Sequence, residues 1–206
     1  MTVRGPNGAA GTSSLLSRKT GRPMPKTLHT TVTFLEMHKK PLTLHMAAPL
    51  RNYALLRAEN PPVHYYRYLY HMVGRDYAWV NRKRMPDEEL VEIIHHAQVE
   101  IYVLYAGGAP AGFFELDFRN GQDVDLVFFG LMPEFYGIGL SRFLLAQAIN
   151  LAWRNGTKRL QVQTCTLDHP RALPLYQRMG FEPFAQEAAE LVPIDDRDFV
   201  SLTPSK

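Results

Sequence analysis

The chain has 206 residues, 46% of them hydrophobic and 11% aromatic, which is enough apolar material for a buried core and excludes wholesale disorder. Its single cysteine excludes an intramolecular disulfide framework. No apolar stretch approaches the ~18 residues that a membrane-spanning helix needs, and no secretory signal is recognisable. These features predict a cytoplasmic protein without membrane attachment.

The small net charge of +3 conceals a basic N-terminal arm. Seven Lys or Arg residues and one Glu lie within residues 1–40, so the rest of the chain is mildly acidic. Residues 1–26 are rich in Gly, Pro, Ser and Thr without any apolar period, which is typical of a disordered tail. We therefore predict a disordered basic tail over 1–26 and a single domain over 27–206, and we do not expect nucleic acid as a partner.

The first half of the domain combines mixed signals with a few clear elements. Residues 30–37 alternate β-branched and apolar side chains, which predicts a strand. A tyrosine-rich segment at 63–73 predicts a helix that Gly74 ends. Pro86 and the three acids after it predict a helix to about His96, because negative charge is favourable at a helix N-terminus.

The second half alternates strands and helices more regularly. Turns at Gly107-Gly108 and Asn120-Gly121 are short enough to make the three strands around them antiparallel. An amphipathic helix, a strand, a second helix and a final extended segment follow. The predicted ranges are strands at 99–105, 111–118, 124–131 and 160–164, helices at about 140–152 and 170–179, and extended structure from 181. This order predicts an α/β (α+β) fold, with a mixed, mostly antiparallel sheet of six to seven strands and about four helices.

A glycine-bearing loop joins the apolar strand at 124–131 to the helix that follows it. The segment from Pro133 to Ser141 reads PEFYGIGLS. Amides at the start of a helix lack backbone partners, and glycine removes side chains that would block a phosphate. Such a loop is able to hold a diphosphate without a lysine. It is neither a Walker loop, because no Gly-Lys-Ser/Thr follows, nor a dinucleotide loop, because Arg142 takes the place of the third glycine.

These segments resemble the GNAT superfamily of acyl-CoA-dependent N-acetyltransferases. The family strand ends in Val-x-Pro before a loop of the form Arg/Gln-x-x-Gly-x-Gly/Ala, and residues 131–141 keep that register. A second family segment, Asn-x-x-Ala-x-x-Leu-Tyr-x-x-x-Gly-Phe, is matched over 169–181. Three positions depart from the family pattern, since Tyr136 replaces Arg or Gln, Ser141 replaces Gly or Ala, and His169 replaces Asn.

The resemblance implies direct transfer of an acetyl group from acetyl-CoA to a primary amine in a ternary complex, without a metal. The amine acceptor is a small molecule or a peptide, and a homodimer stays open. A bulged strand at 127–131 is implied to leave the neighbouring strand and pair with the cofactor, with Gly130 as the expected irregular position and the Leu131 amide as oxyanion donor. The implied cofactor-binding residues are Phe129, Leu131, Met132, Tyr136, Gly137, Ile138, Gly139, Leu140, Ser141, Arg142 and His169.

Two catalytic roles are assigned from the same resemblance and from acid–base chemistry. Tyr176 carries the position of the family's tyrosine acid, and its phenol is able to protonate the leaving thiolate. A primary amine is mostly ammonium at neutral pH, so a base is needed. Asp125 is the first candidate because it faces the same side as Leu131 in a regular strand. Glu115 and Asp117 are the alternatives, and a solvated surface carboxylate is the bland interpretation of all three.

Several other features have ordinary structural interpretations. Cys165, Asp168 and His169 lie too close in sequence for a nucleophilic triad, and Asp168 is interpreted as a helix cap. The acceptor pocket has candidate lining residues in the tyrosine-rich region. These are Tyr65, Tyr68, Arg75, Tyr77 and Trp79. A non-catalytic acyl-CoA-binding sensor or interaction module stays open as the alternative function.

Overall fold

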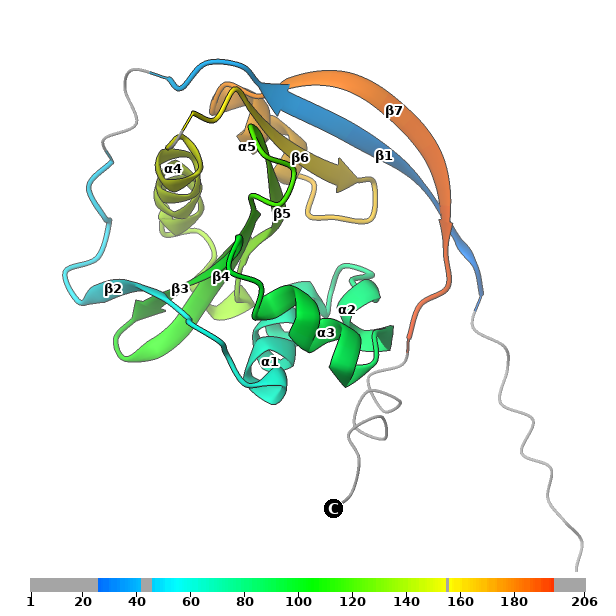
Figure 1. Ribbon diagram of the computed structural model, residues 1–206, viewed down its shortest axis with the longest axis horizontal. Helices are drawn as coiled ribbons and strands as arrows, with labels where there is room; N and C mark the ends of the chain where they lie inside the picture. Colours follow the sequence, from blue (N-terminus) through cyan, green and yellow to red (C-terminus); the bar gives the residue numbers. More distant parts are fainter. Residues whose placement is uncertain (1–25, 42–45, 155, 195–206) are drawn as a thin grey trace, which may run out of the picture.

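The computed structural model of the chain describes residues 26–41, 46–154 and 156–194 (Figure 1). The predicted tail over 1–26 therefore lies outside the described residues, apart from Lys26. The strands are β1 (Leu28–Met37), β2 (Tyr53–Arg57), β3 (Val99–Ala106), β4 (Ala109–Asp117), β5 (Asp123–Leu131), β6 (Arg159–Cys165) and β7 (Glu182–Leu191). The helices are α1 (Val63–Gly74), α2 (Asn81–Arg84), α3 (Asp87–Ile94), α4 (Leu140–Ala152) and α5 (Ala172–Arg178).

The seven strands form one sheet in the order β2-β3-β4-β5-β6-β1-β7. Every neighbouring pair is antiparallel except β5 and β6, which run parallel. The predicted fold class is thereby confirmed. Two short elements, β2 and α2, were not predicted, because five half-exposed residues at a sheet edge and a four-residue helix carry little periodicity.

The helices cover the two faces of the sheet with separate cores (Figure 1). Helices α4 and α5 contribute Leu144 and Tyr176 to one core, while α1 and α3 contribute Leu69 and Leu90 to the other. Each of these four helices buries apolar residues on the side that faces the sheet, which is the main source of its stability in water. Within the described part of the chain, no helix has the length and apolarity needed to cross a membrane.

Strand β1 is inserted between β6 and β7, although it is the first strand in the sequence. It pairs with β6 only from Val32 onward, whereas its pairing with β7 begins at Leu28. Residues 28–31 and 188–191 therefore form a two-stranded extension beyond β6, which curves away from the sheet in Figure 1. This extension supplies one wall of the cavity described below.

The pairing of β4 with β5 contains one bulge, and its position differs from the prediction. Leu116 pairs with Leu126 and Glu115 with Phe128, so Val127 is the extra residue. The expectation of an irregularity at Gly130 is wrong, since Gly130 pairs regularly with Phe113. The glycine is needed for packing instead, because a Cβ at Gly130 would lie 2.3 Å from Cγ1 of Val73 in α1.

Candidate active site

Strand β5 separates from β6 halfway along its length. The β5–β6 pairing ends at Leu126 and Val162, while β5 continues to Leu131 beside β4. The amide of Met132 donates to the carbonyl of Ala111 at 2.8 Å. Because hydrogen-bonding direction alternates along an antiparallel strand, Phe129 and Leu131 direct their amide and carbonyl groups away from β4. The splay of this strand, expected from the family resemblance, leaves these groups facing a gap.

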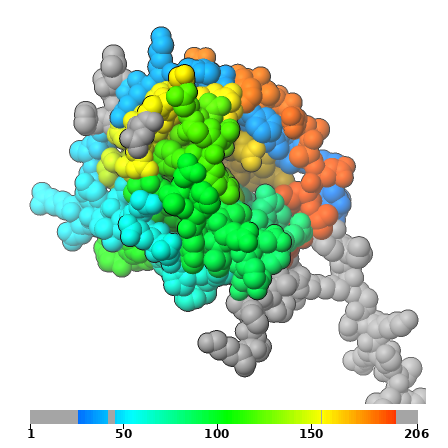
Figure 2. All heavy atoms as spheres, viewed as in Figure 1, coloured from blue at the N-terminus to red at the C-terminus, as the bar shows by residue number. Residues whose placement is uncertain are grey.

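A cavity of about 340 Å³ occupies this gap and extends to both sides of it. Its walls come from β5 and the loop after it, from β6 and the start of α5, from the α1–α2 segment, and from the β1–β7 extension. In Figure 2 the surface is hollowed between the blue and orange atoms of β1 and β7 and the green atoms of the helices. The space is therefore bounded by segments far apart in the sequence.

The loop before α4 presents amides without backbone partners. Gly137 and Gly139 have φ angles of +81° and +84°, in the left-handed region that favours glycine. The amides of Gly137, Ile138 and Gly139 donate no backbone hydrogen bond to a described residue. Helix α4 has no side-chain cap at its N-terminus, so its first-turn amides are also available. Together with the helix dipole, these donors suit an anionic group such as a diphosphate.

The predicted cofactor residues divide into two groups by position. Eight line the cavity, namely Phe129, Leu131, Tyr136, Gly137, Gly139, Leu140, Ser141 and His169. Met132, Ile138 and Arg142 do not line it. Met132 is buried in the core beneath α1 and α3, whereas the Ile138 side chain is 45% exposed. A role in cofactor binding for Ile138 and Arg142 therefore falls on their backbone amides.

Tyr176 lines the same cavity from α5. It is 5% exposed, and its ring lies 6.1 Å from that of Phe129, centroid to centroid. Its hydroxyl makes no hydrogen bond to any described residue. Burial, and then the nearby charge of Asp168, raise the pKa of the Tyr176 phenol above its ordinary value. The side chain is therefore a protonated donor without an acceptor among the described residues, as an acid for a departing thiolate must be.

Asp125 is not where a regular strand would place it. The bulge at Val127 reverses the alternation, so Phe129 joins Leu126 on the α4 face while Asp125 lies on the opposite face. Asp125 is half-buried opposite Asp117 and does not line the cavity. Burial, and then repulsion by Asp117, raise the pKa of the Asp125 carboxyl. The expectation that Asp125 faces the same side as Leu131 is thus wrong.

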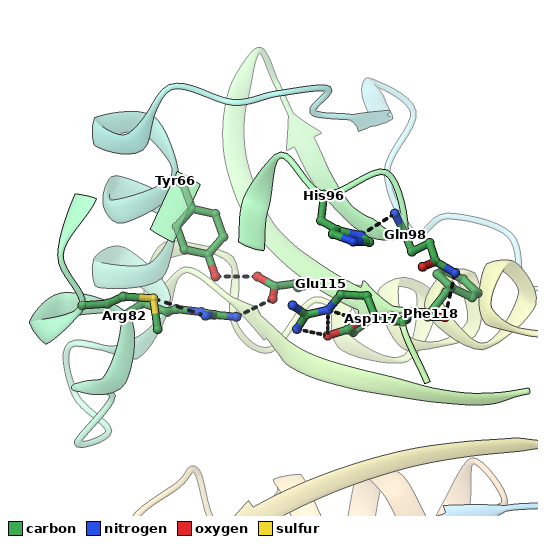
Figure 3. A network of polar contacts seen from close by, with 9 residues as sticks. Tyr66, Arg82, His96, Gln98, Glu115, Asp117 and Phe118 are labelled. Atoms are coloured by element: carbon green, nitrogen blue, oxygen red, sulfur yellow. Dashed lines mark hydrogen bonds and ion pairs between the residues drawn. The ribbon is translucent and has the colours of Figure 1, made fainter. Parts of the chain in front are cut away.

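The alternative carboxylates Glu115 and Asp117 have partners of their own (Figure 3). Fully buried Glu115 accepts hydrogen bonds from the Tyr66 hydroxyl at 2.5 Å and from Arg82 at 2.8 Å. Asp117 accepts bonds from the amide and side chain of Arg119. Neither Glu115 nor Asp117 lines the cavity. The Glu115–Arg82 pair instead anchors α2 to β4, which holds the segment before α2 against the sheet.

Two of the five predicted pocket aromatics and bases line the cavity, Tyr77 and Trp79. Tyr65 bonds to the Tyr105 hydroxyl at 2.5 Å and lies elsewhere, as do Tyr68 and Arg75. Gly74 makes the position of Trp79 possible, since a Cβ at Gly74 would lie 2.5 Å from the indole. The end of α1 is therefore shaped to place one indole ring in the wall.

Asp168 is a cavity residue whose role the sequence interpretation missed. Helix α5 has no side-chain cap, so the interpretation of Asp168 as its cap is wrong. Its Oδ2 accepts bonds from the Thr164 hydroxyl and the Cys165 amide, and its Oδ1 accepts one from Trp79 Nε1. The available signal was its isolation, because Asp168 is the sole acidic residue between 159 and 181.

His169 lies between two tyrosines at the loop side of the cavity. Its ring centroid is 6.0 Å from that of Tyr77 and 5.8 Å from that of Tyr136. Its Nδ1 accepts the amide of Arg171 at 3.0 Å. The rings of Tyr77, Tyr136 and His169 thus form a cluster. Two of them, Tyr136 and His169, replace the polar residues that are typical of the family at these positions.

A sheet that splays beside a strand–loop–helix segment with unpartnered amides is the arrangement that the family resemblance implies. The family model described as "Acetyltransferase (GNAT) family" matches residues 66–181, which is more than half of the chain. The chain belongs to the GNAT acetyltransferase family. A comparison with curated proteins finds no match.

Solved structures share the fold at low sequence identity. A functionally unknown conserved protein from Staphylococcus epidermidis is similar at 14% identity and a TM-score of 0.59, covering 82% of this chain and 64% of its own. A tandem GNAT protein from the clavulanic acid biosynthesis pathway is similar at 17% identity and a TM-score of 0.56, covering 84% and 56%. A protein described as an acetyltransferase from the GNAT family of Novosphingobium aromaticivorans is similar at 14% identity and a TM-score of 0.52. The match covers 84% of this chain and 69% of that protein. The chain thus spans less than two thirds of the first two structures.

Proposed function

We propose that the protein transfers an acetyl group from acetyl-CoA to a primary amine by direct attack, with both substrates bound together. The loop amides from Gly137 to Arg142 hold the diphosphate of coenzyme A. The outward-facing backbone groups of Phe129 and Leu131 pair with its pantetheine chain like an added strand. These contacts place the thioester where β5 and β6 separate.

Orientation of the substrates and stabilisation of the developing charge then supply most of the rate acceleration. Holding the thioester beside the amine lowers the activation free energy, by about 7–11 kcal/mol in well-oriented model reactions. The Leu131 amide donates to the oxyanion that develops on the thioester oxygen. Tyr176 gives its proton to the sulfur as the carbon–sulfur bond breaks, so the product leaves as a thiol.

One observation supports this proposal most directly. The unpartnered loop amides, the free edge of β5 and the Tyr176 phenol all border one cavity, although they come from separate parts of the sequence. An anion site, an extended-chain site and a proton donor in that order match the diphosphate, pantetheine and sulfur of acetyl-CoA. Family membership supports the same chemistry.

Binding and turnover are to be measured separately. Calorimetric titration of the full chain with CoA and acetyl-CoA is expected to show saturable binding. A thiol-release assay with a panel of polyamines, aromatic amines, amino acids, aminoglycosides and peptides is expected to find an acceptor, with the acetylated amine confirmed by mass spectrometry. Failure to bind either nucleotide would contradict the proposal.

A non-catalytic acyl-CoA sensor is the second candidate. It is favoured by the replacement of family-typical polar residues by Tyr136 and His169, which lie together beside the loop. Such a sensor binds acetyl-CoA in the calorimeter and releases no thiol with any member of the panel. The two measurements therefore separate enzyme from sensor.

A further inference from the structure

Asp168 is held in the cavity with one oxygen able to receive another donor. Its Oδ2 accepts bonds from Thr164 Oγ1 at 2.8 Å and from the Cys165 amide at 2.9 Å. Its Oδ1 accepts a single bond, from Trp79 Nε1 at 3.1 Å. A carboxylate oxygen accepts two hydrogen bonds, so Oδ1 retains one acceptor position. The carboxylate is thus fixed between β6 and the segment before α2, and it is not saturated.

Asp168 also lies near the proposed acid. Both Asp168 and Tyr176 border the cavity, and the Asp168 charge acts on the Tyr176 phenol. Asp168 lies in the turn after β6 and Tyr176 lies in α5. Both residues border the region where β5 and β6 separate. A fixed carboxylate and a protonated phenol therefore border the space in which the thioester is proposed to lie.

The other carboxylates of the described chain are less suited to this position. Only Asp168 and Glu190 line the cavity among the described acidic residues. The Glu190 side chain is 68% exposed and lies 3.3 Å from His29. Asp125 is on the opposite face of β5, and Glu115 is engaged by Arg82. Asp168 is consequently the one partly buried carboxylate that an amine entering the described cavity would meet.

We propose that Asp168 binds the ammonium group of the acceptor and takes one of its protons. The inference rests on the proposed function and assigns its general base. Asp168 Oδ1 removes the first proton, and the freed nitrogen lone pair forms the carbon–nitrogen bond. As the carbon–sulfur bond breaks, Tyr176 protonates the sulfur and recovers a proton from the nitrogen. Asp168 then releases its proton to water, so ammonium and thioester become amide, thiol and one proton.

The surroundings of Asp168 suggest a suitable pair of probes. Trp79, Tyr77, Val73 and Leu175 give this part of the cavity an aromatic and aliphatic lining. Benzylamine and phenylhydrazine have the same shape and the same number of heavy atoms. Benzylamine is an ammonium ion at pH 7, whereas the terminal nitrogen of phenylhydrazine is already neutral. Only benzylamine therefore needs a base.

The test compares the two probes in Asp168→Asn, with Asp123→Asn as the matched control. Asp123 is a half-buried aspartate at a strand start, paired with Arg159 and outside the cavity lining. Asp168→Asn is expected to lower kcat/KM for benzylamine by about 100-fold or more, the usual contribution of a general base, and for phenylhydrazine by less than about tenfold. Asp123→Asn is expected to leave the ratio of the two unchanged.

A structural role for Asp168 predicts a different pattern. If Asp168→Asn lowered kcat/KM for both probes equally while CoA still bound, the proposal would be overturned. If Asp168→Asn lost CoA binding through misfolding, Asp168→Glu and Asp168→Gln would be compared instead. A rise in the phenylhydrazine-to-benzylamine ratio in the Gln variant but not the Glu variant supports the base, and equal ratios contradict it.

The remaining outcomes also decide. Selective loss of benzylamine turnover in Asp125→Asn, with Asp168→Asn active, assigns the base to Asp125. If the wild type turned over neither probe, benzylammonium would be titrated into the CoA-bound chain. Binding weakened by Asp168→Asn supports the proposal, and binding that is absent or unchanged overturns it. Failure of the wild type to bind CoA, in contrast, would contradict the proposed function itself.

Discussion

Trp79 Nε1 donates a 3.1 Å hydrogen bond to Asp168 Oδ1, which joins two residues of the cavity wall that are 89 positions apart in the sequence. The indole packs against the rings of Tyr70 and Phe128, whose centroids each lie 5.2 Å from that of Trp79, and these two rings lie 4.9 Å from each other. The carboxylate therefore takes part of its orientation from an aromatic cluster of the opposite layer. The proposed base and the packing of the aromatic cluster therefore meet at this contact.

Replacing Trp79 with Phe keeps an aromatic ring but removes that donor. We expect a loss of about 1.5–3 kcal/mol in the free energy of unfolding, which is the usual net contribution of a hydrogen bond to a charged group. The KM for the amine is expected to rise, because Asp168 is less well oriented, while the Kd for CoA stays unchanged. Urea denaturation and steady-state kinetics check both. An unchanged amine KM would contradict the positioning role of Trp79.

Replacing Tyr176 with Phe removes the proposed acid without changing the ring. We expect kcat to fall by about 100-fold, as for loss of a general acid, with little change in acetyl-CoA affinity. Rapid thiol-release kinetics and calorimetry measure the two quantities. Normal turnover in this variant would remove Tyr176 from the mechanism.

The raised pKa of Tyr176 has a consequence for stability at high pH. The folded-state pKa lies above the ordinary value of about 10, so the folded protein binds this proton more tightly than the unfolded chain. The contribution of the protonated Tyr176 phenol to the free energy of unfolding is fully present below about pH 10. It is lost as the pH rises toward the folded-state pKa. Wild type is thus expected to lose more stability than Tyr176→Phe between pH 10 and pH 12, measured by urea denaturation. If the free energy of unfolding fell equally with pH in both proteins, this prediction would be contradicted.

Gly139 and Gly108 form a matched pair for testing the loop. Their φ angles are +84° and +87°, so a valine at either position costs similar backbone strain, at least 1–2 kcal/mol by the usual left-handed penalty. Gly108 lies in the β3–β4 hairpin, away from the cavity lining. Gly139→Val is expected to weaken acetyl-CoA binding by about tenfold or more, a loss of about 1.4 kcal/mol. If Gly108→Val weakened binding equally, the effect would be general instability.

Gly130 and Val73 offer a test of how α1 is placed on β5. A Cβ at Gly130 would lie 2.3 Å from Val73 Cγ1, so Gly130→Ala is expected to cost about 1–3 kcal/mol through overpacking. Val73→Ala in the same chain removes the opposing methyl groups and is expected to restore part of the loss. A double-mutant cycle from urea denaturation measures the coupling. Purely additive effects would show that the contact is not the cause.

The buried carboxylate of Glu115 is expected to stabilise the folded protein through its ion pair with Arg82. Glu115→Gln leaves the Arg82 guanidinium buried without its carboxylate, which is expected to cost about 3–5 kcal/mol. Burial, opposed chiefly by Arg82, raises the pKa of the Glu115 carboxyl above its ordinary value. Glu88→Gln, at an exposed position of α3, is the control and is expected to be neutral within about 0.5 kcal/mol. Equal midpoints for the two variants in urea would contradict the buried-pair interpretation.

The sequence by itself determined the local features of this protein. The turn at Gly107-Gly108, the amphipathic helix after the glycine loop and the two family segments are encoded in neighbouring residues, whose spacing and conformational preferences act over a few positions. The conformation of the loop before α4 was predictable for the same reason, since Gly137 and Gly139 adopt positive φ angles before a helix.

Only the tertiary structure decided which side chains meet. The insertion of β1 between β6 and β7, the bulge at Val127 and the bond from Trp79 to Asp168 all depend on residues that are distant in sequence. One extra residue in β5 was enough to turn Asp125 to the other face, because side chains alternate along a strand. Packing between layers, which no local pattern encodes, placed Asp168 rather than Asp125 at the cavity.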